Sequence, residues 1–349
     1  MQRAWTLCSA NDEEPNDTYR DWLLVAINHY GGWIADFWVH YCNQLRNRAG
    51  GLLEGIPDFV RDILKQAVEG TNSCCMHARI SLTPWIGSIF SLDRDFAVVT
   101  FIPLFAWDRD AVVAQQTWSV FLGHSWGSTD DLEILLLPHY KELALRLSES
   151  EVKELDQLGE HALHNFGHRL AALALSIIPD PLKLEFFREF LPLLSHHVRG
   201  ALSHGIGEGL AEAPDEEHRR LWNTWLETYL QQRLIGIPVP FVNAETKHML
   251  YWCLHLDPVF TEAVDLITKT SPQGVWSHRV YDGMLTHHAL DEFPIHSCRL
   301  VNAAVKADEF PHLDETLKKL HERFRKRIAR SPEFSIFESL LYDLGWQKP

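Results

Sequence analysis

Apolar residues recur along most of the chain at the three- and four-residue spacing of one face of an amphipathic helix. In 33–45, large side chains such as Trp33 and Trp38 form a broad apolar stripe. The pair Gly31-Gly32 separates this stripe from a second helical pattern in 19–29, which predicts a helix–turn–helix. The same period returns in later segments, at 59–67, 112–121, 143–147, 152–162, 221–234 and 249–256.

Proline residues mark many of the boundaries between these segments, because a proline at the start of a helix loses no hydrogen bond. They are Pro57, Pro181, Pro240, Pro258, Pro294, Pro311 and Pro332. Only 96–105 has the β-branched and aromatic density of a strand, and Pro103 argues against one there. We interpret it as a short helix or an extended link. The pattern therefore predicts an all-α fold, an irregular and solenoid-like stack of αα-hairpins with little or no sheet.

The domain organisation follows from the same pattern. We expect an N-terminal tail over 1–18, one continuous helical body over 19–332, and a C-terminal helix and tail over 333–349. Glycines at 205, 207 and 209, followed by Pro214, suggest a possible seam near 205–214. We also expect the tryptophans on the apolar stripes to pack in the core rather than to stack on bases: Trp33, Trp38, Trp118, Trp222, Trp225 and Trp252.

Composition narrows the classes of function. The chain has 349 residues, of which 46% are hydrophobic, and 32 Lys and Arg against 47 Asp and Glu give a net charge of −15. This acidic balance argues against broad binding to nucleic acid or an anionic membrane. We see no apolar run of about 20 residues and no secretory signal pattern, so we expect a cytoplasmic protein. Six scattered cysteines without a C-x-x-C pair are interpreted as reduced thiols.

Gly123-His-Ser125-Trp-Gly127 matches the G-x-S-x-G pattern of α/β-hydrolases. That motif requires a strand before the serine and a parallel sheet around it. Here the preceding residues continue a helical stripe, and Ser-Thr-Asp-Asp follows. We therefore favour a polar loop between helices and keep a hydrolase that uses Ser125 as the alternative.

Histidine is abundant, with 20 residues, and His161, His164 and His168 share one face of a predicted helix. A metal enzyme is a second alternative, but same-face pairs are expected by chance in so histidine-rich a chain. We predict no metal site, no cofactor and no catalytic residue. Paired carboxylates such as Asp93 and Asp95 precede predicted helices, where they favour helix capping over acid–base catalysis.

One helix near the C-terminus is strongly basic, and its apolar stripe faces the opposite way. The simplest interpretation is a solvated helix face, and the functional prediction is that the helix docks a partner protein. A nucleic-acid-binding protein that uses the same residues remains a third alternative, which the net charge disfavours. The candidate docking residues are Lys318, Lys319, Arg323, Arg325, Lys326, Arg327 and Arg330.

Four segments, 27–38, 101–107, 118–122 and 225–238, resemble a bacterial C-terminal domain of uncharacterised function. This domain is found downstream of a sirtuin-like NAD-hydrolysing module in anti-phage defence proteins. The resemblance extends from about residue 21 to about residue 324, and the turn Arg233…Gly236-Ile-Pro238 is one of its more specific marks. Family members usually have proline where this chain has Tyr30.

No catalytic residue is assigned to that domain, so the resemblance transfers none. It implies a non-catalytic sensor, regulatory or assembly module of a bacterial antiviral defence system, working with a sirtuin-like effector. The partner would be an effector domain or a sister protomer, and a phage-derived trigger could also bind. The residues alone predict only a helical scaffold with a basic docking face.

Overall fold

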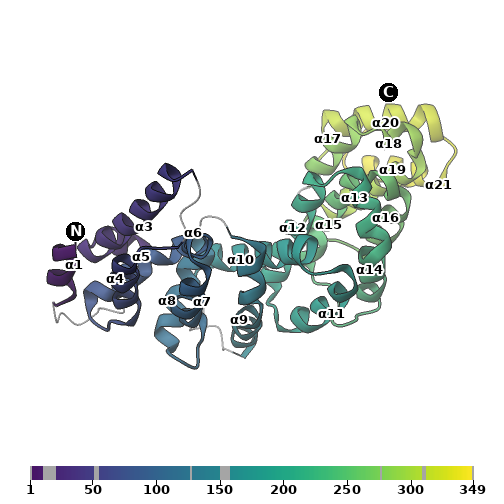
Figure 1. Cartoon of the computed structure of the whole chain (residues 1–349). Helices are drawn as coiled ribbons and strands as arrows, with labels where there is room; N and C mark the ends of the chain where they lie inside the picture. The colour runs from purple at the N-terminus through teal and green to yellow at the C-terminus, as the bar shows by residue number, and fades with distance from the viewer. Residues whose placement is uncertain are drawn as a thin grey trace. The chain divides into compact units, whose positions relative to one another are not determined.

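The computed structural model is all-α, as the hydrophobic pattern predicts. It describes residues 2–10, 21–50, 55–125, 128–149, 158–275, 277–308 and 312–347. These ranges contain no strand, and their only β-type contact is an isolated bridge between Val275 and Asp308. The chain divides into two compact units, Met1–Asn165 and Phe166–Pro349. Figure 1 shows the helices in chain order.

The described residues of the first unit form nine α-helices and the start of a tenth. Its helices are α1 (Gln2–Ser9), α2 (Trp22–Ile27), α3 (Tyr30–Arg48), α4 (Asp58–Glu69), α5 (Ser73–Leu82), α6 (Ile86–Leu92), α7 (Arg94–Thr100), α8 (Ala111–His124) and α9 (Asp130–Glu149), with 3₁₀ turns η1 (Thr83–Trp85) and η2 (Ile102–Phe105). Helix α10 (Glu160–Ala172) crosses the boundary between the units. The segment 96–105, for which we expected a short helix or an extended link, is therefore helical.

The second unit continues from α10 through a π-helical turn, η4 (Leu173–Ile177). Its helices are α11 (Asp180–Phe190), α12 (His196–Glu212), α13 (Asp215–Leu221), α14 (Glu227–Leu234), α15 (Asn243–Trp252), α16 (Phe260–Ile267), α17 (His278–Thr286), α18 (Ala289–Glu292), α19 (Pro294–Ala307), α20 (Glu315–Ile328) and α21 (Pro332–Asp343). Between them lie η5 (Leu191–Leu193), the π turn η6 (Trp222–Leu226), η7 (Cys253–His255), η8 (Asp257–Val259) and η9 (Thr268–Thr270).

The N-terminal segment differs from the predicted tail. Residues 2–9 form α1, because its apolar face is covered: Trp5 is buried and donates its indole N–H to Gln66 Oε1 at 2.9 Å. Cys8, also buried, forms a disulfide with Cys74 in α5. The expectation that all six cysteines are reduced thiols was therefore wrong for this pair. The remainder of the predicted tail, 11–18, lies outside the described residues.

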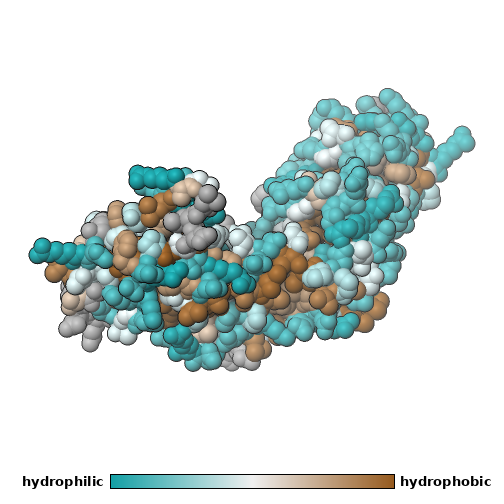
Figure 2. Space-filling model, viewed as in Figure 1, coloured by the Kyte–Doolittle hydropathy of each residue, from teal (hydrophilic) through white to brown (hydrophobic). Residues whose placement is uncertain are grey.

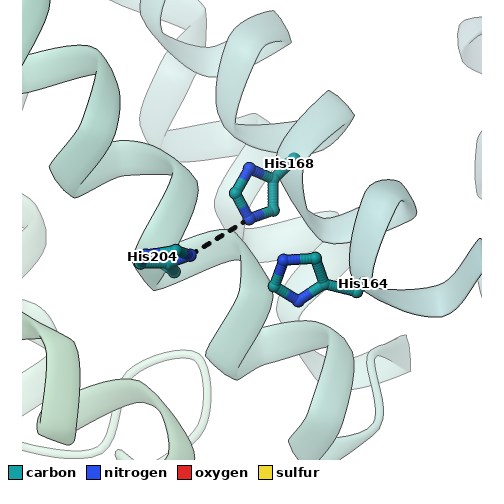
Figure 3. Close-up of side chains that lie close together, drawn as sticks. All are labelled: His164, His168 and His204. Carbon is teal, nitrogen blue, oxygen red and sulfur yellow. Dashed lines mark hydrogen bonds between the residues drawn. The ribbon is translucent and has the colours of Figure 1, made fainter. Parts of the chain in front are cut away.

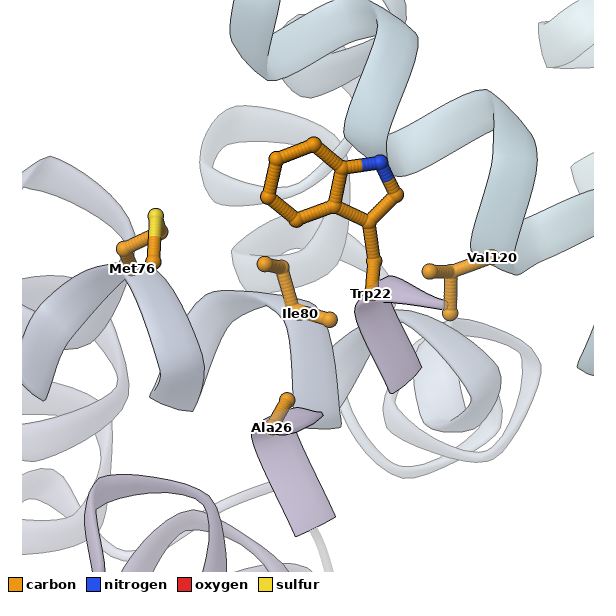
Figure 4. Packing of buried hydrophobic residues seen from close by; sticks show 5 residues of the cluster. All are labelled: Trp22, Ala26, Met76, Ile80 and Val120. Atoms are coloured by element: carbon orange, nitrogen blue, oxygen red, sulfur yellow. The ribbon is translucent and has the colours of Figure 1, made fainter. Parts of the chain in front are cut away.

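A small apolar cluster joins three helices of the first unit. Trp22 and Ala26 of α2 meet Met76 and Ile80 of α5, and Val120 of α8 closes the cluster (Figure 4). These contacts bring together segments nearly 100 residues apart in sequence. Burying them removes apolar surface from water, which is the main force that orders such a helical unit.

The two glycines at 31 and 32 do not form the predicted turn. The turn lies at Asn28 and His29, and α3 already begins at Tyr30. A Cβ at Gly32 would come within 2.0 Å of the Ala26 carbonyl oxygen, and one at Gly31 within 2.5 Å of that of Cys74. The glycines therefore allow the start of α3 to pack closely against α2 and α5.

Three charged side chains form a buried network in the second unit. Glu245 lies in the first turn of α15, and its Oε2 accepts hydrogen bonds from Arg199 Nη2 on α12 at 2.5 Å and from Arg233 Nη2 on α14 at 2.8 Å. Glu245 Oε1 accepts from Arg233 at 2.7 Å. All three residues are buried. Both guanidinium groups also donate to the carbonyl oxygen of Pro240, which fixes the loop before α15.

The possible seam near 205–214 lies largely inside a helix, because α12 runs unbroken to Glu212. Its glycines are packing positions. A Cβ at Gly205 would lie 2.8 Å from Ala171 Cβ, and one at Gly207 would lie 2.9 Å from the Trp252 ring. Trp252 also donates its indole N–H to the Ser203 carbonyl oxygen at 3.0 Å. Gly207 therefore sets how closely α15 approaches α12, and Gly205 sets how closely α10 does.

Most stripe tryptophans are buried as predicted: Trp38, Trp118, Trp222, Trp225 and Trp252. Trp33 is an exception, since 60% of it is exposed and its indole N–H bonds to the Ile27 carbonyl oxygen. Among the described residues, no helix is both long and apolar enough to cross a membrane.

We predict that Trp38→Ala lowers the free energy of unfolding by about 3–5 kcal/mol. The Trp38 ring is buried and makes edge-on contacts with Tyr41 and Phe59, so its removal leaves a cavity. Trp33→Ala, on the same helix, is the matched control and should cost less than about 1 kcal/mol. Urea unfolding followed by circular dichroism measures both, and equal losses from the two variants would contradict the assignment of the core.

We further predict that Glu245→Gln destabilises the second unit by about 3–5 kcal/mol, because it leaves two buried guanidinium groups without a counter-charge. The control is Glu262→Gln, an exposed carboxylate in the first turn of α16. Differential scanning calorimetry of the full chain reports both variants. A melting temperature for Glu245→Gln equal to that of the control would show that the network contributes no stability.

Candidate functional site

Histidines from three helices of the second unit lie close together. His168 Nε2 on α10 is 3.3 Å from His204 Nδ1 on α12, and the ring of His248 on α15 packs against His204 with centroids 4.8 Å apart. Figure 3 shows His168 and His204 facing each other, with His164 on the same helix as His168. The predicted face of α10 thus carries part of this cluster, whereas the roles of His204 and His248 depend on the packing of α12 and α15.

Glu208 lies one helical turn after His204 and contacts both facing rings. Its Oε2 is 3.1 Å from His168 Nδ1, and its Oε1 is 3.7 Å from His204 Nε2. Each contact uses the ring nitrogen that points away from the other histidine. A carboxylate in this position favours an N–H on the ring nitrogen beside it.

Two glycines allow these rings to meet. A Cβ at Gly167, next to His168, would lie 2.6 Å from Ala201 Cβ and 2.7 Å from the Val198 carbonyl oxygen. A Cβ at Gly205, next to His204, would lie 3.2 Å from His168 Cα. The two helices can approach this closely only because both positions lack a side chain. The cluster therefore depends on these two glycines as well as on its histidines.

A pocket of about 640 Å³ adjoins the cluster. Its lining mixes acidic, basic and imidazole groups, and the charged residues come from α12, α15 and α17. The residues with polar side chains are His204, Glu208, Glu212, Lys247, His248, Tyr251 and Arg279. Because His204, Glu208 and His248 belong to both features, the histidine cluster forms part of the wall of a solvent-connected pocket.

The second histidine group, at His287 and His288, has a structural role. His287 Nε2 lies 3.0 Å from the Leu254 carbonyl oxygen and 2.7 Å from Asp257 Oδ1, while its Nδ1 accepts the Ala289 N–H at 3.2 Å. Both ring nitrogens of His287 therefore form contacts within the fold. His288 is about half exposed and lies 3.7 Å from the same aspartate.

The predicted docking cations lie on or just beyond α20, but two of them are used within the fold. Arg323 donates to the Leu285 carbonyl oxygen at 3.1 Å and to Asp291 Oδ1 at 2.6 Å. Arg327 donates to the Asp291 carbonyl oxygen at 3.1 Å and lies 2.9 Å from the same carboxylate. These arginines anchor α20 to α18, so they are structural contacts rather than a free docking surface.

The other five cations are exposed. Lys318 lies 3.5 Å from Glu315, one turn earlier on the helix. Within the described part of the chain, no ion pair is formed by Lys319, Arg325, Lys326 or Arg330. Figure 2 shows the surface around α17 and α20 as predominantly hydrophilic.

The G-x-S-x-G motif does not lie in the setting that a hydrolase needs. Helix α8 continues through His124, and Ser125 ends it by donating its backbone N–H to the Phe121 carbonyl oxygen at 3.1 Å. A helix rather than a strand therefore precedes the serine. The last two residues of the motif, Trp126 and Gly127, lie outside the described residues.

Other side chains that could take part in catalysis, namely carboxylates and unbridged cysteines, have structural roles or are buried. Asp93 accepts from the Phe96 N–H and pairs with Arg61, and Asp110 caps α8, so these carboxylates cap helices as predicted. The unbridged cysteines Cys42, Cys75, Cys253 and Cys298 are all buried. Burial raises the pKa of Cys42 to about 11 and raises the pKa of the other three thiols as well, which disfavours a reactive thiolate.

A family model described as a domain of unknown function (DUF4020) matches residues 185–299. The matched range begins in α11 and ends in α19, so it includes the buried Arg199–Glu245–Arg233 network and most of the pocket wall. Helix α20 lies outside it. No curated protein and no solved structure matches the chain.

We predict that Ser125→Ala leaves the free energy of unfolding within about 0.5 kcal/mol of wild type and leaves any biological activity unchanged. The serine ends a helix and has no strand to hold it as a nucleophile. Labelling of the wild-type chain with a fluorophosphonate probe is the complementary measurement, and we expect none. Stoichiometric labelling that Ser125→Ala abolishes would establish a serine hydrolase instead.

Proposed function

We propose that this chain is a non-catalytic docking module whose basic residues on and just after α20 bind an acidic protein surface. The observation that carries the proposal is that only some of the seven candidate cations contact the rest of the fold. Arg323 and Arg327 fix the helix to Asp291, whereas Lys319, Arg325, Lys326 and Arg330 are exposed and form no ion pair among the described residues. We call these four residues the basic face.

The contacts of Arg323 and Arg327 favour docking because they hold α20 in place before a partner binds. A helix held at Arg323, at Arg327 and along its buried apolar side loses little further backbone entropy on binding. Charges presented in this way act mainly on the rate of association and on the choice of partner. The proposal therefore expects binding that weakens as salt screens the charges.

A protein partner suits the electrostatics better than nucleic acid. The chain has a net charge of −15, so a polyanion is repelled by most of the molecule, whereas an acidic patch on a folded protein can approach the basic face locally. The resemblance to C-terminal domains of defence proteins suggests the partner. We propose a sirtuin-like NAD-hydrolysing effector of a bacterial anti-phage system, or a sister protomer that assembles with it, in the cytoplasm. A phage-derived trigger would relieve or promote that contact.

The test reverses the charge of three of the four basic-face residues and leaves the contacts of Arg323 and Arg327 with Asp291 in place. Lys319→Glu, Lys326→Glu and Arg330→Glu are combined in one variant, and the control combines Arg48→Glu, Lys269→Glu and Lys306→Glu, three exposed cations elsewhere with the same change in net charge. Binding to a purified sirtuin-like protein encoded beside the gene is measured by biolayer interferometry at two salt concentrations. We expect the basic-face variant to lose at least tenfold in affinity and the control to lose little.

The same variants separate this proposal from nucleic-acid recognition. Fluorescence anisotropy with labelled duplex and single-stranded DNA at about 0.15 M salt should show no sub-micromolar binding. Tight DNA binding that the basic-face variant abolishes would replace protein docking with nucleic-acid sensing. Equal protein binding by both variants would refute the role of α20.

A further inference from the structure

We propose that His168 and His204 bind a divalent transition-metal ion of the zinc class, and that Glu208 holds both rings in the tautomers this requires. Imidazole nitrogen is a preferred ligand of Zn²⁺, Ni²⁺, Co²⁺ and Cu²⁺. The proposal concerns the histidine cluster of the second unit and is independent of the docking function of α20.

The spacing of the two nitrogens fits a shared metal ion. Zinc–nitrogen bonds measure about 2.0–2.1 Å, so two nitrogens on one tetrahedral ion lie about 3.3–3.4 Å apart. His168 Nε2 and His204 Nδ1 are 3.3 Å apart. A hydrogen bond between the two rings would give a similar distance, so the choice between them depends on the protonation that the surroundings impose.

Glu208 favours the metal. Its carboxylate lies beside His168 Nδ1 at 3.1 Å and on the side of His204 Nε2 at 3.7 Å, so it stabilises an N–H on each of those nitrogens. The lone pairs of His168 Nε2 and His204 Nδ1 then face each other, an arrangement that a bound cation stabilises. A carboxylate that accepts the far N–H of a ligand histidine is the usual outer-shell partner of a zinc site.

A third imidazole of the second unit lies beside His204, because the ring of His248 on α15 packs against it with centroids 4.8 Å apart. The adjoining pocket, lined by His204 and His248, gives a hydrated ion access to the cluster. His287 lacks these properties, because both of its ring nitrogens already bond within the fold.

The test uses the full chain after treatment with EDTA. Isothermal titration with Zn²⁺ should give one equivalent bound at micromolar affinity or tighter, and Co²⁺ should give the intense visible absorption of a tetrahedral site. We expect His168→Gln and His204→Gln each to weaken binding at least 100-fold, and Glu208→Gln to weaken it about 10–100-fold. The matched control is His196→Gln, an exposed histidine on the same helix as His204, which should bind as wild type does.

Circular dichroism separates loss of binding from loss of folding. Glu208 is exposed, so Glu208→Gln folds even if a histidine variant does not, and its affinity alone still tests the role of the carboxylate. Zn²⁺ should also raise the melting temperature of the wild type and not that of the folded His168→Gln variant. Stoichiometric binding that survives the combined His168→Gln and His204→Gln changes would place the ion elsewhere. No binding at 0.1 mM Zn²⁺ would overturn the proposal.

Discussion

The buried contact of Glu245 with Arg199 and Arg233 is the constraint on which the second unit depends. It joins α12, α14 and the start of α15, and through Pro240 it also fixes the loop between the last two. Loss of any one partner would leave a buried charge uncompensated, so the network disfavours shifts of these helices relative to one another. His204 follows Arg199 by five residues and His248 follows Glu245 by three, so the same arrangement of helices brings the two imidazoles together.

Close packing of the helices also determines where the histidines lie. Gly167 and Gly205 let α10 and α12 approach until His168 meets His204, and Gly207 admits the Trp252 ring of α15. Larger residues at these positions would separate the helices and the imidazoles with them. The pocket beside the cluster follows from the same geometry, because its walls are the faces of α12 and α15 together with α17. Ion network, glycines and histidines therefore form one arrangement rather than three separate features.

The sequence predicts what depends on local periodicity and misses what depends on distant partners. The repeated helical spacing was sufficient for the all-α fold, and the caps at Asp93 and Asp110 are local too. The stripe of α3 is wide enough to include both Trp33 and Trp38, and only the neighbouring helices decide that the second is buried. Likewise, no sequence spacing indicates that Cys8 reaches Cys74, or that Arg323 and Arg327 share Asp291. Glu208 follows His204 by four residues, a spacing that places both on one helix face and is a weak sequence signal for their contact.

The two proposed sites differ in how they relate to the matched domain. His204, Glu208 and His248 lie within residues 185–299, and the buried ion network that positions two of them lies there as well. The basic face lies beyond that range, on a helix that is held by contacts with residues inside it: Leu285 and Asp291. Among the described residues, the contacts given above for His168, His204, Glu208 and His248 include none with α20.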